Sequence, residues 1–152
     1  MAASEWYHQK MAIAATIDPV NTATATTLYT DGIDMDVFEK AIFIVAANTI
    51  AANTTAVLTV MSGTAATVSA MTNTVATSGT LTNGTDDSQM WVEVDTEDFN
   101  VDARHRYCGG VLTVAGTGGT IDHIAVIGLG ANTRYHPASD YDLATVTSIT
   151  NS

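Results

Sequence analysis

The lone cysteine is the first residue whose type and surroundings suggest chemistry. Cys108 follows His105 by three positions, so a thiol nucleophile activated by an imidazole base is one interpretation of this pair. Cys108 also lies within an apolar segment that predicts a strand, where a cysteine behaves as a small buried apolar group. We expect the buried alternative, and a single cysteine excludes an intrachain disulfide.

Carboxylates and histidines are the other groups that could hold a metal ion. Asp34 and Asp36, with Asp31 nearby, offer oxygen ligands to calcium, but the segment lacks the regular alternation and terminal glutamate of an EF-hand loop. No HxH or HxxxH spacing places two histidines on one face; they are His8, His105, His123 and His136. We therefore expect neither a metal site nor a cofactor.

The sequence also lacks the short motifs of common hydrolases and nucleotide-binding proteins. It contains no Gly-x-Ser-x-Gly elbow, and the glycines at 116–119 are followed by neither a lysine nor a predicted helix. Asp122 and His123 are adjacent in a predicted strand, so their side chains should point to opposite faces. These observations favour a protein that is not an enzyme.

Short strands are the elements that would position these side chains. Residues 107–115 and 120–129 are rich in Val, Leu and Thr and flank a glycine-rich turn, which predicts a β-hairpin. The continuous apolar run at 41–47 predicts a central strand covered on both faces. Further strands are predicted at 24–29, at 54–61 and, with alternating apolar and polar residues, at 90–95.

The remaining segments complete a prediction of fold class. A turn is expected at Asp18-Pro19, and the Thr-rich tract 64–85 forms either two weak strands or a long loop that contacts a partner or a neighbouring subunit. Regularly spaced short strands predict an all-β chain, a single antiparallel β-sandwich or jelly-roll-like barrel. Its parts would be an N-terminal arm (1–11), the sandwich (12–130) and a C-terminal extension (131–152).

The balance of charge narrows the choice of partners. Acidic side chains number 16 against five basic ones, which gives a formal net charge of −11 at pH 7. Such a chain repels nucleic acid and an anionic membrane surface, so neither is an expected partner. No apolar run is long enough to span a bilayer, and the first residues lack the apolar segment of a signal peptide. We expect synthesis in the cytoplasm.

Aromatic residues near the two ends are candidates for intermolecular contact. Trp6, Tyr7 and His8 lie on the N-terminal arm, where large aromatic rings are costly to leave in water. The arm either covers the open end of its own sandwich or docks on a neighbouring molecule. Tyr135, near the C-terminal segment, is a further candidate contact.

A basic cluster in an otherwise acidic chain supplies the other candidates. Arg104 and Arg106 either dock on an acidic surface of a partner or pair locally with nearby carboxylates. The carboxylates closest in sequence belong to Glu97, Asp98 and Asp102.

Three ordered runs resemble small β-rich proteins encoded among the head genes of tailed bacteriophages: LYTDGIDMDVFEKAIFIVAANTIAANTTAVLTV, DDSQMWVEVD and RHRYCGGVLTVAGTGGTIDHIAVIGLG. The shared pattern is a Tyr, then Ile-Asp, Phe and an apolar strand, followed by an Asp-Asp-Ser turn and a Leu-Thr-Val-Ala-Gly-Thr segment. The resemblance covers residues 26–129. The aromatic arm, the Thr-rich tract and the C-terminal extension depart from the pattern.

The resemblance implies a capsid decoration or cement protein. Such a protein would lie on the outer surface of the virion head, bind the major capsid protein and catalyse nothing. Decoration sites lie on capsid symmetry axes, so a homotrimer, or another homo-oligomer, is expected. Two alternatives stay open. One is a tail tube, fibre or adaptor component, and the other is a small carbohydrate-binding module, which would display several exposed coplanar aromatics.

Overall fold

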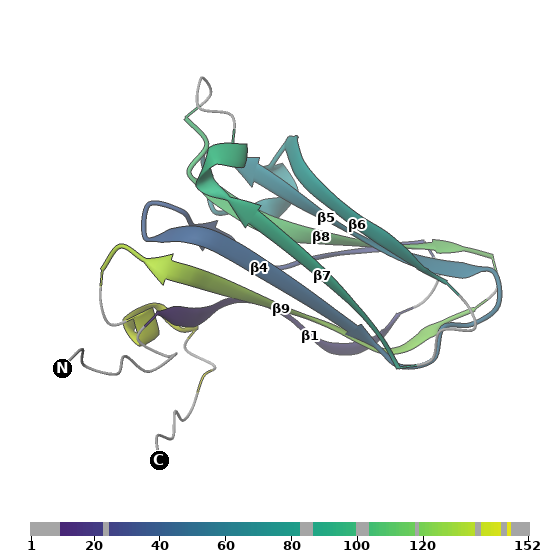
Figure 1. Cartoon of the computed structure of the whole chain (residues 1–152). Helices are drawn as coiled ribbons and strands as arrows, with labels where there is room; N and C mark the ends of the chain where they lie inside the picture. The colour runs from purple at the N-terminus through teal and green to yellow at the C-terminus, as the bar shows by residue number, and fades with distance from the viewer. Residues whose placement is uncertain are drawn as a thin grey trace, which may run out of the picture.

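The computed structural model describes residues 10–22, 25–82, 87–99, 104–117, 119–135, 138–143 and 146. Figure 1 shows two antiparallel sheets that lie face to face. The expected all-β sandwich is therefore confirmed. The helices are single 3-10 turns, and within the described ranges none is long and apolar enough to cross a membrane.

Each sheet has a simple strand order. The four-stranded sheet has the order β1 (Met11–Thr22), β9 (Ile121–Thr133), β4 (Phe38–Ala47) and β7 (Ser88–Asp95). The five-stranded sheet has the order β2 (Thr26–Tyr29), β8 (Tyr107–Gly116), β5 (Thr54–Gly63) and β6 (Asn73–Thr82), and β3 (Ile33–Asp34) also pairs with β8. The 3-10 helices are η2 (Val68–Ala70), η3 (Thr96–Asp98) and η4 (Ala138–Tyr141).

The strand order is that of a jelly roll. β2 and β3 pair with successive parts of β8, since Tyr29 lies opposite Val111 and Ile33 lies opposite Cys108. They therefore act as one interrupted edge strand. With β2 and β3 counted together, the described chain has two sheets of four strands, and most connections pass from one sheet to the other, as in a double Greek key.

The predicted hairpin between residues 107 and 129 is wrong. β8 pairs with β2 and β5, whereas β9 pairs with β1 and β4, so the two strands lie in different sheets. Gly116 and Gly119 have φ values of +132° and +150°, which glycine tolerates better than any other residue. The glycine-rich segment therefore carries the chain across the sandwich instead of folding it back within one sheet.

The sequence predicted only a turn before residue 24, so the N-terminal strand β1 was missed. β1 has twelve residues, and Asp18-Pro19 falls within it at a register shift between Ile17 and Val20. A proline is tolerated there because β1 is an edge strand and the bulge needs no N–H from this position. The predicted turn is thus an irregularity in an edge strand.

The C-terminal residues pack on the outer edge of β1. Ile13 donates its N–H to the Asp142 carboxylate (2.6 Å), and its carbonyl accepts from the Leu143 N–H (2.8 Å). The Tyr141 ring lies 5.8 Å from the Phe38 ring in an edge-to-face arrangement. These contacts protect an otherwise open strand edge.

The Thr-rich tract is mostly a strand. Its described part forms η2 and the edge strand β6, not a long loop. Val68 of η2 is buried against β8 at Gly109, where a Cβ atom would collide with the valine side chain. The absence of a side chain at Gly109 therefore lets this segment pack onto the body.

Candidate functional site

The predicted contact residues that the structure describes gather at one end of the sandwich. The turn between β3 and β4 is bonded to the chain on both sides. Met35 donates its N–H to the Arg106 carbonyl (2.9 Å), and Arg134, next to Tyr135, donates its backbone N–H to the Val37 carbonyl (2.8 Å). Arg106 and Tyr135 thus flank this turn from different sheets. Arg104 lies two residues before Arg106. Trp6, Tyr7 and His8 fall outside the described residues.

All lysines and arginines of the protein lie at this same end, beside carboxylates that include Asp34, Asp36, Glu93 and Asp95. β1 begins there, since Met11 pairs with Ala131, which in turn pairs with Lys40. The five lysines and arginines of the sequence are Lys10, Lys40, Arg104, Arg106 and Arg134. We call this region the basic end. By contrast, residues 41–85 contain no charged side chain at all.

Arg106 is held in a local ion-pair cluster. Its Nε donates to Asp34 Oδ1 (2.8 Å), its second guanidinium nitrogen also contacts Asp34, and Nε lies 3.1 Å from Asp36 Oδ2. The hydrogen bond from Arg106 holds the pKa of the Asp34 carboxyl below its ordinary value. Local pairing is therefore confirmed for Arg106, but the predicted partners Glu97 and Asp98 are wrong; Asp102 lies outside the described residues.

The side chains of Arg104 and Tyr135 are more accessible to a partner than that of Arg106, which is held in ion pairs. Arg104 is exposed, has a left-handed backbone (φ 53°) and forms no ion pair with any described residue. The Tyr135 side chain is 61% exposed, and its backbone N–H is fixed by the Thr133 hydroxyl at 3.2 Å. These two side chains are free to meet a partner.

A serine–histidine contact lies beside the basic end. Ser62 Oγ is 2.8 Å from His105 Nδ1 and accepts a hydrogen bond from the Asn73 side chain at 2.9 Å. This pairing is used by hydrolases to activate a nucleophile, but Ser62 is fully buried and out of reach of a substrate. The contact ties β5, β6 and the start of β8 together.

Cys108 is also fully buried, as its place in an apolar strand predicted. Burial raises the pKa of its thiol, because the surrounding apolar groups cannot stabilise a thiolate. The Cys108 side chain therefore serves as core packing.

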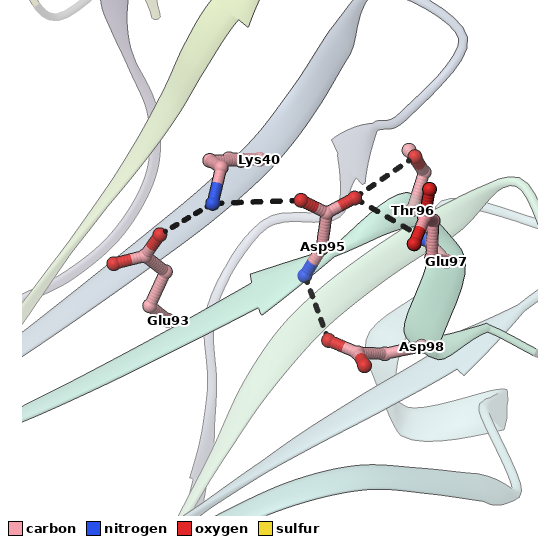
Figure 2. Close-up of polar contacts among 6 residues, drawn as sticks. All are labelled: Lys40, Glu93, Asp95, Thr96, Glu97 and Asp98. Atoms are coloured by element: carbon pink, nitrogen blue, oxygen red, sulfur yellow. Dashed lines mark hydrogen bonds and ion pairs between the residues drawn. The ribbon is translucent and has the colours of Figure 1, made fainter.

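A second charged cluster borders the four-stranded sheet at the basic end. Figure 2 shows Lys40 between Glu93 and Asp95, at Nζ to oxygen distances of 2.8 and 3.5 Å. Asp95 also begins η3: its carboxylate accepts from the Glu97 N–H, and its own N–H donates to the Asp98 carboxylate (2.9 Å). We call Lys40, Glu93 and Asp95 the charged rim, in which the reciprocal cap holds Asp95 in place.

Next to this rim lies a surface that the sequence interpretation missed. Alternate residues of the four-stranded sheet point away from the sandwich, and among them Trp91 is 60% exposed and Ile127 is 45% exposed. Half-buried apolar residues lie between and beside these two. We call this group of residues the apolar face: Ile42, Ile44, Trp91, Ile127 and Leu129.

The apolar face corrects one prediction. β4 is central, as expected, but only its inner side is covered, by the core around Phe43 and Val45. Its outer side carries Ile42 and Ile44, which no other described part of the chain covers fully. The alternation of Trp91 with buried Val92 was the signal that one side of this sheet stays open.

Comparisons with known proteins give only distant likenesses. No protein-family model and no curated protein matches the sequence. Among solved structures, that of infectious bursal disease virus strain Gx has a TM-score of 0.45 at 12% identity, over 85% of this chain and 33% of that one. The VP2 subviral particle of the same virus has a TM-score of 0.40 at 11% identity, over 81% and 38%. This chain thus spans 33% and 38% of those two chains, and the jelly-roll assignment rests on its own strand order.

Proposed function

We propose that this chain is a structural protein of a tailed-phage virion that binds the major capsid protein from outside and reinforces the shell. It acts as a decoration or cement protein and catalyses no reaction. The sequence resemblance suggests this role. The observation that carries the proposal is the gathering of Arg104, Tyr135 and the start of β1 at the basic end.

The arrangement of these groups suits attachment to a shell. β1 begins at the same end of the sandwich as Arg104 and Tyr135, so a partner at this end could contact the start of β1 and both exposed side chains. The net charge of −11 repels the packaged genome. Because a shell offers many copies of one site, each contact can be weak and still hold the protein in an array.

The assembly state is part of the same proposal. A site on a three-fold axis of the shell would take a homotrimer, and the arms could then reach across the seams between capsomers. The nearest rival function places the protein in the tail, as a tube, fibre or adaptor component. A carbohydrate-binding module is the more distant rival.

Binding to purified heads and tails tests the proposal. The wild-type chain is mixed with undecorated heads and, separately, with tails, and the bound fraction is measured after sedimentation. We expect binding to heads alone. Binding to tails alone would instead support the tail rival.

A double variant tests the basic end. Arg104→Ser with Tyr135→Ser should lower head binding about tenfold, since exposed arginine and tyrosine are frequent anchors of interfaces. Tyr29→Ser is the matched control, because Tyr29 is 48% exposed on β2, away from the basic end. Equal binding by both variants would remove the basic end from the contact.

A further inference from the structure

We propose that the C-terminal segment of one copy of this chain docks on the outer edge of β1 in a neighbouring copy, in place of that copy's own segment. We call residues 138–143, together with Val146, the C-terminal strap. The inference concerns contact between copies and goes beyond the proposed binding to the shell.

The strap pairs with β1 in the way that a further strand would. Ile13 donates its N–H to the Asp142 carboxylate at 2.6 Å, and its carbonyl accepts from the Leu143 N–H at 2.8 Å. In an antiparallel sheet, the N–H and C=O of one residue point to the same side of the strand. Both groups of Ile13 therefore face away from β9, and the strap satisfies both of them.

The edge that receives the strap belongs to the body of the sandwich. Ile13 lies opposite Leu129 of β9, and Phe38, whose ring meets the Tyr141 ring at 5.8 Å, lies opposite Thr133 of the same strand. Figure 1 shows the turn of η4, in yellow-green, beside the purple start of β1. Because β1 and β4 have their own pairing with β9, the receiving edge exists whether or not a strap is seated on it.

A short link joins the strap to the body. Tyr135 is still fixed at the end of β9, since the Thr133 hydroxyl accepts its N–H at 3.2 Å. Only His136 and Pro137 separate Tyr135 from Ala138, the first residue of the strap, which is fully buried. Short links between a body and a docked segment favour exchange of that segment between identical chains.

The contacts of the seated strap identify its replacement as the strap of another copy. An open strand edge accepts many extended segments through its backbone groups. Here the acceptor for the Ile13 N–H is a side-chain carboxylate, and a tyrosine ring one residue earlier meets Phe38. A second copy carries Tyr141, Asp142 and Leu143 in the same order, so its strap can repeat each contact without any new one.

The local concentration of straps decides which strap is seated. Since the two straps make the same contacts, the strength of those contacts cancels from the comparison. A segment on a short linker has an effective concentration on the order of 1 mM at its own docking site. Dilute chains therefore keep their own straps, whereas chains at about 1 mM exchange them. Copies held side by side on a shell would be tied together by the same exchange.

Locking the strap tests the inference in the full chain. The double variant Ile13→Cys with Leu143→Cys is treated at about 10 µM with a short bis-maleimide linker, which joins the strap to its own β1. Cys108 is fully buried and should not react. In sedimentation velocity at about 1 mM, the wild-type chain and the unlinked variant should form a larger species, and the linked variant should stay monomeric. A wild-type chain that is monomeric at about 1 mM would overturn the inference, as would equal association of the linked and unlinked variants.

Mixed single variants detect the exchange itself. A ¹⁵N-labelled Ile13→Cys chain and an unlabelled Leu143→Cys chain are mixed at about 1 mM and treated with the same linker, and the mixed product is identified by its mass. It should form at least about tenfold faster than with Tyr29→Cys in place of Ile13→Cys, because Tyr29 lies on the other sheet. Equal rates would show that the strap does not reach a second copy. Neither experiment bears on head binding, which is measured with dilute chains that keep their own straps.

Discussion

Trp91 lies directly opposite Ile44 in the antiparallel pairing of β7 with β4, and both side chains face away from the core of the sandwich. This pair defines the centre of the apolar face. The charged rim of Lys40, Glu93 and Asp95 borders this face at the basic end of the same sheet. The apolar face therefore adjoins the charged rim directly, because Glu93 lies opposite Ile42.

The pairing of Arg106 with Asp34 predicts a specific dependence of stability on pH. The pKa of Asp34 in the folded chain is below its ordinary value of 3.8, so the ionised carboxylate stabilises the fold. This contribution is fully present above about pH 4 and is lost as the pH falls through the lowered pKa. Asp34→Asn removes it at every pH.

Urea unfolding of the wild type and Asp34→Asn between about pH 7 and pH 3 measures this effect. The wild type should be the more stable at pH 7, and the difference should shrink below about pH 4. Asp18→Asn, at an exposed position on β1, is the control. A difference that stays constant down to pH 3 would show that the ionisation of Asp34 does not contribute.

Burial of Cys108 predicts an unreactive thiol. In the folded chain, a disulfide reagent such as DTNB should react about a thousandfold or more slowly than in the unfolded chain, because reaction requires opening of the structure. In denaturant, one thiol per chain should react at once. Rapid stoichiometric labelling of the folded chain would mean that Cys108 is accessible and would reopen the catalytic interpretation of this residue.

Close packing at Gly32 predicts that adding one methyl group there lowers the stability of the fold substantially. An added Cβ at Gly32 would lie 2.9 Å from the Ala66 Cα and closer still to the Ala66 carbonyl oxygen, so the backbone would have to move. Gly32→Ala should lower the free energy of unfolding by about 1–3 kcal/mol. Gly79→Ala is the control, since a Cβ there meets nothing within 4 Å. Equal stabilities of the two variants would contradict this packing.

The reciprocal cap at Asp95 predicts that Asp95 contributes more to stability than the nearby Glu93. Asp95→Ala removes both the cap of η3 and one partner of Lys40 (Figure 2), and should cost about 1 kcal/mol in thermal or denaturant unfolding. Glu93→Gln removes only an exposed ion-pair partner and should cost less than about 0.5 kcal/mol. A larger effect for Glu93→Gln would mean that the ion pair, not the cap, stabilises this rim.

Local patterns in the sequence predicted the strands but not their partners. The alternation of Met90, Val92 and Val94 placed the inward side of β7 correctly, because side chains on a strand alternate whatever the strand pairs with. The glycines at 116–119 fit a hairpin and a crossover equally well. Which of the two forms depends on the distant pairing of β8 with β5 and of β9 with β4.

Local sequence patterns likewise identified residues of the candidate site but not their arrangement in space. Arg104, Arg106 and Tyr135 were identified from residue type, but their common location depends on the turn between β3 and β4, which is far from all three in sequence. The apolar face likewise joins residues of three strands through their register. A single sequence contains the outward positions of each strand but not the register that sets them side by side.

Imaging of virions in which the chain carries a bound label tests the central proposal most directly. Electron micrographs of phage particles labelled with antibody or gold against this protein should show label distributed over the outer surface of the head, with none on the tail. Label confined to the tail, or intact particles that carry none of the protein, would contradict a role as a capsid decoration protein.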